Sequence, residues 1–83
     1  MGQQVQIQEW APREYVVERL EAEYQEVREA LGVTNTGAVV ELFTSKDGET
    51  WTIIVTLPNG MSRMVAAGEA WTPQPVPVKG IEG

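Results

Sequence analysis

The stretch TWTIIVTLPNGMSRMVAA, residues 50 to 67, decides the fold because it contains two strand-like runs joined by a tight turn. The first run, Thr50 to Leu57, is rich in β-branched residues, which favour strands. The second run is Met61 to Ala67. Between them, Pro58 fixes its own φ angle and Gly60 occupies the turn position that needs a positive φ. The pattern predicts an antiparallel hairpin.

A third strand-like run, AVVELFT at Ala38 to Thr44, lies just upstream of this hairpin. The connection between the two, Ser45 to Glu49, contains Asp47-Gly48, a frequent hairpin signal. Because both connections are short, the three runs are predicted to form an up-down-up antiparallel meander.

The segment before the meander, from Pro12 to Leu31, has the periodicity of an amphipathic helix. Pro12 suits the first position of a helix, and Gly32 suits the position just after its end. Apolar residues separated by three and four positions form one stripe, so a long helix with one buried face is predicted. The stripe consists of Val17, Leu20, Tyr24, Val27 and Leu31.

The second strand should present different side chains on its two faces, because successive residues of a strand point in opposite directions. We expect the helix to pack on the apolar face, since its own stripe needs an apolar partner. The threonine-rich face is then expected to meet solvent. The expected core face carries Trp51, Ile53 and Val55, and the expected solvent face carries Thr50, Thr52, Ile54 and Thr56.

These elements predict a single α+β domain, in which one long amphipathic N-terminal helix packs on a three-stranded antiparallel meander. Residues 1–11 form an N-terminal arm that is either a short edge strand or frayed, residues 12–72 form the domain, and residues 73–83 form an extended proline-rich tail. Prolines at every second position of the tail prevent continuous strand pairing. The tail is expected either to cover a sheet edge or to contact another protein.

Composition excludes several functional classes. The chain has 83 residues and a net charge of −6, so it repels phosphate backbones and anionic lipid headgroups. Nucleic acid and membrane insertion are therefore not expected, and no apolar run approaches the ~20 residues of a membrane span. The chain contains no cysteine and no histidine, which excludes thiol and imidazole chemistry.

No catalytic, metal or cofactor site is predicted. Hairpin turn chemistry explains Asp47 and Glu49 better than calcium binding, which needs more oxygen ligands. Glu41, inside an apolar strand, is expected to point outward. It could serve with Glu69 as an acid and base pair only if folding brought the two together. Serines next to Lys46 and Arg63 are strand neighbours of these bases and should point to opposite faces.

The tryptophans are the best candidates for contact with a partner. Trp51 is expected in the core, with an exposed aromatic patch as the alternative, and for Trp71 both interpretations stay open. Trp71 introduces the proline-rich tail, and together they form the predicted partner-binding segment. Its candidate residues are Trp71, Pro73, Pro75, Val76, Pro77 and Val78.

Three segments together resemble a family of small, functionally uncharacterised exported bacterial proteins: PREYVVERLEAEYQE, VVELFTSKDGETWTIIVTLPNG and MVAAGEAW. The family carries one cysteine before the helix and one in the last strand, which implies a disulfide between them. The matching positions here are Trp10 and Arg63, so this sequence departs from the family at both. The resemblance implies that these two residues face each other, and the Arg63 guanidinium would then stack on the Trp10 indole.

The sequence predicts a non-catalytic protein-binding domain, such as a small accessory subunit of a larger assembly. Two other hypotheses stay open: a free periplasmic module that binds a small ligand, and a hydrolase that uses carboxylates. Ligand binding requires an enclosed pocket lined by Trp51, whereas hydrolysis requires two carboxylates that converge in a cleft. The location is periplasmic if the resemblance holds and a signal peptide has been removed, and cytoplasmic otherwise.

Overall fold

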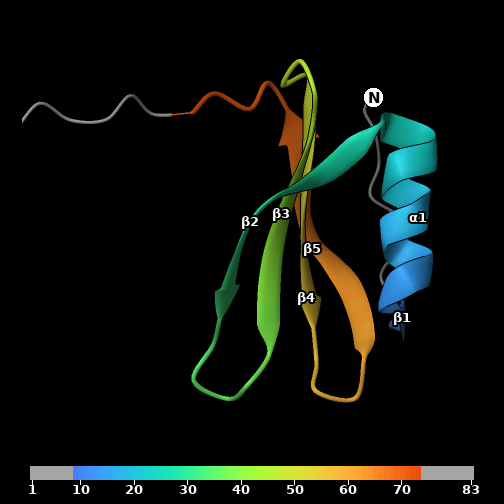
Figure 1. Ribbon diagram of the computed structural model, residues 1–83, viewed down its shortest axis with the longest axis vertical. Coiled ribbons are helices and arrows are strands. Elements are labelled where there is room, and N and C mark those ends of the chain that lie inside the picture. The colour runs from blue at the N-terminus through green and yellow to red at the C-terminus, as the bar shows by residue number, and fades with distance from the viewer. Residues whose placement is uncertain (1–8, 74–83) are drawn as a thin grey trace, which may run out of the picture.

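The computed structural model describes residues 9–73, which form one helix and a five-stranded antiparallel sheet (Figure 1). The strand order is β1-β5-β4-β3-β2. The α+β class is confirmed, but the prediction of three strands is wrong because β1 and β2 extend the meander on its two sides. The elements are β1 (Ala11–Pro12), α1 (Arg13–Tyr24), β2 (Glu26–Val33), β3 (Val39–Ser45), β4 (Thr50–Thr56) and β5 (Met61–Glu69).

The two predicted hairpins are confirmed, and their turns have the predicted chemistry. Gly48 and Gly60 have φ angles of +77° and +89°, which glycine adopts without steric strain. In the first turn the Asp47 carboxylate accepts hydrogen bonds from the Ser45 hydroxyl at 3.0 Å and from the Glu49 backbone N–H at 3.1 Å. Asp47 therefore stabilises the turn that joins β3 to β4.

The helix is shorter than predicted. It ends at Tyr24, and Gln25 takes a left-handed conformation with φ +55°, so the chain leaves the helix there. Residues expected in its last two turns instead form β2, which pairs antiparallel with β3. Without β2, the outer backbone groups of β3 would lack their ladder partners, so tertiary pairing outweighs the helical periodicity.

The helix also packs on the opposite face of the sheet from the one expected. The core consists of Val16 and Leu20 from α1 together with Phe43 and Ile54 from the sheet. Thr52 lies opposite Phe43 on this face and is buried. Phe43 and Ile54, with Met64 packed against them, provide the apolar surface on which the helix packs. The expectation that the threonine-rich face meets solvent is wrong.

The other face of the sheet carries no covering element among residues 9–73. We call it the open face. Its central pairs are Val40 with Val55 and Leu42 with Ile53, and all four side chains are only half-buried.

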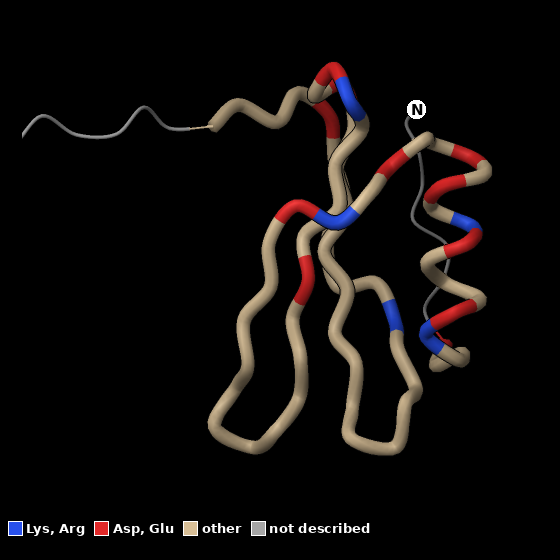
Figure 2. The backbone as a smooth tube through the Cα atoms, viewed as in Figure 1, with Lys and Arg blue, Asp and Glu red and all other residues tan. Residues whose placement is uncertain are grey.

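In the described part of the chain, no helix is long and apolar enough to cross a membrane. Figure 2 shows that charged residues gather on α1 and at the hairpin between β3 and β4, with few along the lower strands.

Candidate functional site

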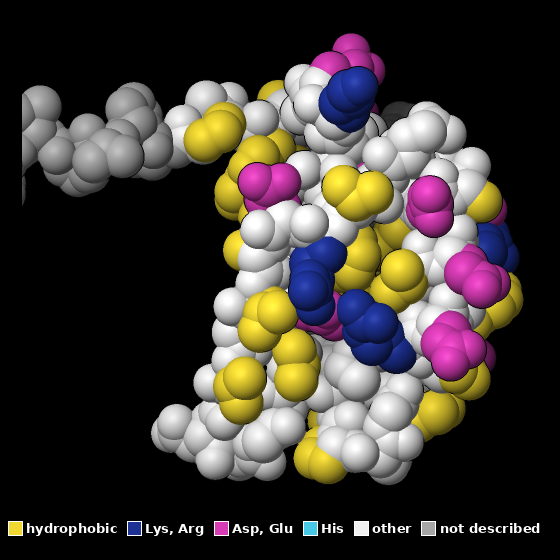
Figure 3. All heavy atoms as spheres, viewed as in Figure 1, with side chains coloured by type: hydrophobic (Ala, Val, Ile, Leu, Met, Phe, Trp, Pro, Cys, Tyr) yellow, Lys and Arg dark blue, Asp and Glu magenta, His cyan; other side chains and the backbone are white. Residues whose placement is uncertain are grey.

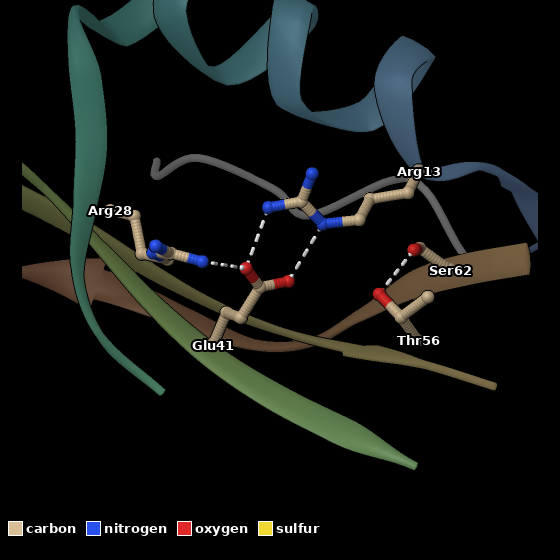
Figure 4. Close-up of polar contacts among 5 residues, drawn as sticks. All are labelled: Arg13, Arg28, Glu41, Thr56 and Ser62. Carbon is tan, nitrogen blue, oxygen red and sulfur yellow. Dashed lines mark hydrogen bonds and ion pairs between the residues drawn. The ribbon is translucent and has the colours of Figure 1, made fainter. Parts of the chain in front are cut away.

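A buried carboxylate between two arginines lies under the helix. Glu41, near the middle of β3, is 1% exposed, and the guanidinium of Arg13 at the start of α1 binds it through two hydrogen bonds of 2.9 and 2.6 Å (Figure 4). Arg28 of β2 makes a longer contact of 3.3 Å with the same carboxylate. The expectation that Glu41 points outward is wrong, because two cations compensate the loss of its hydration.

The electrostatics of this cluster follow from its geometry. The hydrogen bonds from Arg13 lower the pKa of Glu41, against the opposing effect of burial, and Arg28 lowers it further. The same pairing raises the pKa of Arg13. Two guanidinium groups thus share one carboxylate, and half of the Arg28 side chain is exposed. The cluster has one positive charge in excess, in a chain whose net charge is −6.

The cluster forms the floor of an open groove of about 360 Å³, which we call the arginine groove. Figure 3 shows dark-blue side chains between the helix and the strands, with hydrophobic side chains beside them. Sequence reasoning missed this site. The one signal was a glutamate inside an apolar strand, since its partners lie in elements distant in sequence. The lining residues are Arg13, Arg28, Leu31, Val39, Glu41 and Thr56.

The structure does not assemble the acid and base pair considered from the sequence. Glu41 lies opposite Ile54 of β4, whereas Glu69 lies opposite Thr50. Four residues along a strand separate these positions by about 13 Å. The buried hydroxyls of Thr56 and Ser62 bond each other at 2.5 Å rather than an acid or a base (Figure 4). Among residues 9–73 no group of three or more acidic side chains could hold a metal ion.

A second buried carboxylate, Glu26, lies at the start of β2 and has no cationic partner among the described residues. Thr50 donates a hydrogen bond of 2.7 Å to its Oε2 atom, whereas its Oε1 atom is buried without a partner. Burial raises the pKa of Glu26, and the hydrogen bond from Thr50 opposes this only in part. The two buried carboxylates therefore depart from the ordinary pKa in opposite directions.

The open face carries two of the tryptophans singled out from the sequence. The ring centroids of Trp51 and Trp71 are 5.8 Å apart, with the planes tilted by 59°. A β-carbon on Gly68 would lie 2.8 Å from the Trp51 ring, so glycine at this position gives the indole room on the sheet. Pro73, the next candidate, is exposed. The remaining candidates, Pro75, Val76, Pro77 and Val78, lie outside the described residues.

Trp10 and Arg63 lie together at the edge of the open face. The guanidinium carbon of Arg63 is 5.0 Å from the centroid of the Trp10 ring, a cation–π arrangement. β1 pairs Ala11 with Ser62, and one further step in this register places Trp10 opposite Arg63. At the positions of β3, β4 and β5 that the register assigns to the open face, Arg63 is the only charged residue.

Comparisons with protein-family models, with curated proteins and with solved structures found no match. The resemblance to exported bacterial proteins therefore stays a prediction, as does the periplasmic location that it implies.

Proposed function

We propose that this protein is a non-catalytic protein-binding domain and that the open face of its sheet is the binding surface. The observation that carries the proposal is a sheet face with two tryptophans, several branched aliphatic residues and a single charged residue on its three central strands, Arg63. Contiguous exposed apolar patches of this kind mark interaction sites in soluble proteins.

The layering of the domain supports the same proposal. An apolar sheet face is stabilised by packing against a second layer, and here α1 covers only the opposite face. Trp51 and Trp71 add large, rigid aromatic surface, and tryptophan is enriched among residues that dominate binding energy. A partner that covers this face would provide the missing layer.

The structure gives less support to the two rival functions, small-ligand binding and carboxylate-based hydrolysis. A small-ligand module needs an enclosed, mostly apolar pocket, whereas the arginine groove is open and has an ion pair as its floor. A carboxylate hydrolase needs two converging acids, whereas Glu41 is bound by arginine and Glu69 lies at the far end of β5. Protein binding is therefore the better supported function.

Site-specific photo-crosslinking in cells that express the protein tests the proposal. The photoreactive residue p-benzoylphenylalanine is placed at Ile53 or Trp71 on the open face, or at the exposed helical residue Glu21 as a control. We expect discrete protein adducts from the two open-face positions and none from Glu21. A Val55→Lys substitution should abolish the adduct from Trp71, whereas Leu31→Lys, on the helix side, should not. Equal crosslinking from all three positions, or none, would refute the proposal.

A further inference from the structure

β2 is an edge strand whose outer side has no partner among the described residues (Figure 1). Edge strands are normally protected by charges, bulges or short length, because their free backbone groups pair readily with other chains. The first half of β2 has such protection, since a register shift lies between Arg28 and Ala30, around the charged Glu29. Its second half, Ala30–Val33, is exposed and carries no charge.

Three side chains of β2 lie on the helix side of the sheet, and two of them, Arg28 and Leu31, line the arginine groove. Arg28, Leu31 and Val33 pair with Phe43, Glu41 and Val39 of β3, which places them on the helix side of the sheet. The exposed fractions are 51% for Leu31 and 69% for Val33, and 50% for the side chain of Arg28. The free edge and the groove are therefore one continuous surface, cationic at one end and apolar at the other.

From this surface we infer a second binding site: β2 and the arginine groove take an extended acidic segment of another protein by strand addition. The added strand makes backbone hydrogen bonds with β2, and every second side chain of the segment then points toward the groove. Its recognition pattern is a carboxylate over Arg28 and apolar side chains over Leu31 and Val33. One residue of the segment separates neighbouring contacts, as it separates Phe43, Glu41 and Val39 on the other side of β2.

Charge complementarity selects the acidic segment. Among residues 9–73, Arg28 donates a single side-chain hydrogen bond, to Glu41, whereas a guanidinium has five N–H donors. Its charge is not matched, because Arg13 already binds both oxygens of Glu41. Planar guanidinium groups bind carboxylates through two parallel hydrogen bonds, so a carboxylate fits the free side of Arg28. Leu31 and Val39 line the same groove and offer apolar contacts next to this carboxylate.

Fluorescence anisotropy with designed peptides tests the inference. The probe is a labelled peptide in which threonine alternates with one glutamate and two valines, and the matched control has lysine in place of glutamate. We expect saturable binding of the glutamate peptide and roughly fivefold weaker binding of the lysine peptide, since one charge pair contributes up to about 1 kcal/mol. An Arg28→Glu variant should reverse this preference. Circular dichroism establishes that the half-exposed substitution leaves the fold intact.

Each alternative result contradicts the inference. Equal binding of both peptides, no saturable binding, or a preference unchanged by Arg28→Glu would overturn it. Sedimentation velocity is run in parallel, because a dimer that Val33→Lys dissociates would mean that a second copy occupies β2. The test is separate from that of the open face: Ile53→Lys should leave peptide binding unchanged, and Arg28→Glu should leave the crosslinks from Trp71 unchanged.

Discussion

In most sheets the helix covers the more apolar face. Here, among the described residues, the helix covers the more polar face, and the more apolar face is left open. The helix side carries threonines, serines and glutamates, and yet most of these side chains are buried. The open face carries tryptophan, isoleucine, leucine and valine, and yet its central side chains stay half-exposed. Covering the polar face is possible because its groups bond one another, as in the Thr56–Ser62 and Arg13–Glu41 pairs.

The difference indicates that the two faces have different tasks. The helix side holds the fold together, through a small apolar core and buried polar contacts such as the Thr56–Ser62 hydrogen bond. Under the proposed function, the open face contributes less to the stability of the isolated chain and binds a partner. Substitutions on one face should therefore change stability, and those on the other should change binding.

The largest effect is expected from shortening side chains on the two faces. Leu20→Ala should lower the free energy of unfolding by about 2–5 kcal/mol, because Leu20 is 1% exposed in the core. Ile53→Ala should lower it by about 1 kcal/mol, since part of that side chain already contacts water. Urea unfolding followed by circular dichroism measures both. Equal losses would mean that the faces share the work of stabilising the domain.

The next effect concerns the two arginines of the groove. Arg13→Gln should destabilise the domain by about 2 kcal/mol, because it leaves the buried Glu41 charge with only the distant contact from Arg28. Arg28→Gln should cost less than about 1 kcal/mol, since that side chain is half-exposed. Thermal unfolding of both variants measures the difference, and a larger loss for Arg28→Gln would contradict the assigned roles.

A crosslink at the edge of the open face should stabilise the domain. In the double variant Trp10→Cys, Arg63→Cys, the two residues are opposed across an antiparallel pair, within the Cα separation of about 4.4–6.8 Å that disulfides need. Closing a loop of about 50 residues contributes at most about 4 kcal/mol, less the strain and the lost stacking. Thiol titration after air oxidation should find no free thiol. Two reactive thiols would show that the residues are not opposed and would remove support for the family resemblance.

The smallest effects concern pH. The raised pKa of Glu26 means that its protonated form favours folding, and this contribution is lost as the pH rises through the folded-state value. Glu26→Gln should therefore stabilise the domain at pH 8, with a gain that shrinks as the pH falls. The lowered pKa of Glu41 has the opposite consequence, since its contribution is lost as the pH falls through its folded-state value.

Unfolding measured from pH 3 to pH 8 compares Glu26→Gln and Glu41→Gln with the parent. We expect the largest difference for both variants at high pH, with a gain for the first and a loss for the second. The same sign for both variants would contradict the assigned pKa shifts.

Local signals predicted part of this fold. Residues close together in the sequence predict the turns at Gly48 and Gly60 and the three central strands. The end of the helix could not be predicted, because apolar residues at Val27 and Leu31 fit either a helical stripe or a strand, and pairing with β3 decides between them.

The covered face and the arginine groove could not be predicted either. Threonine and valine both suit a strand, so local preference does not decide which face is covered. The helix packs on the face that presents Phe43 and Ile54, which come from neighbouring strands. The groove joins Arg13, Arg28 and Glu41 from three elements, so it exists only in the folded chain. The patch around Trp71 was one of two open alternatives, and its contact with Trp51 places it on the open face.

The most direct test of the account compares two neighbouring residues of β4. The chain contains no cysteine, so the single variants Thr52→Cys and Ile53→Cys each report on one face through the rate of thiol modification in the folded protein. Thr52 is 2% exposed beneath the helix, whereas Ile53 lies on the open face. The account predicts that the thiol at position 53 reacts much faster and that a bound partner protects it. Faster reaction at position 52 would mean that the helix covers the apolar face, and the proposed binding surface would not exist.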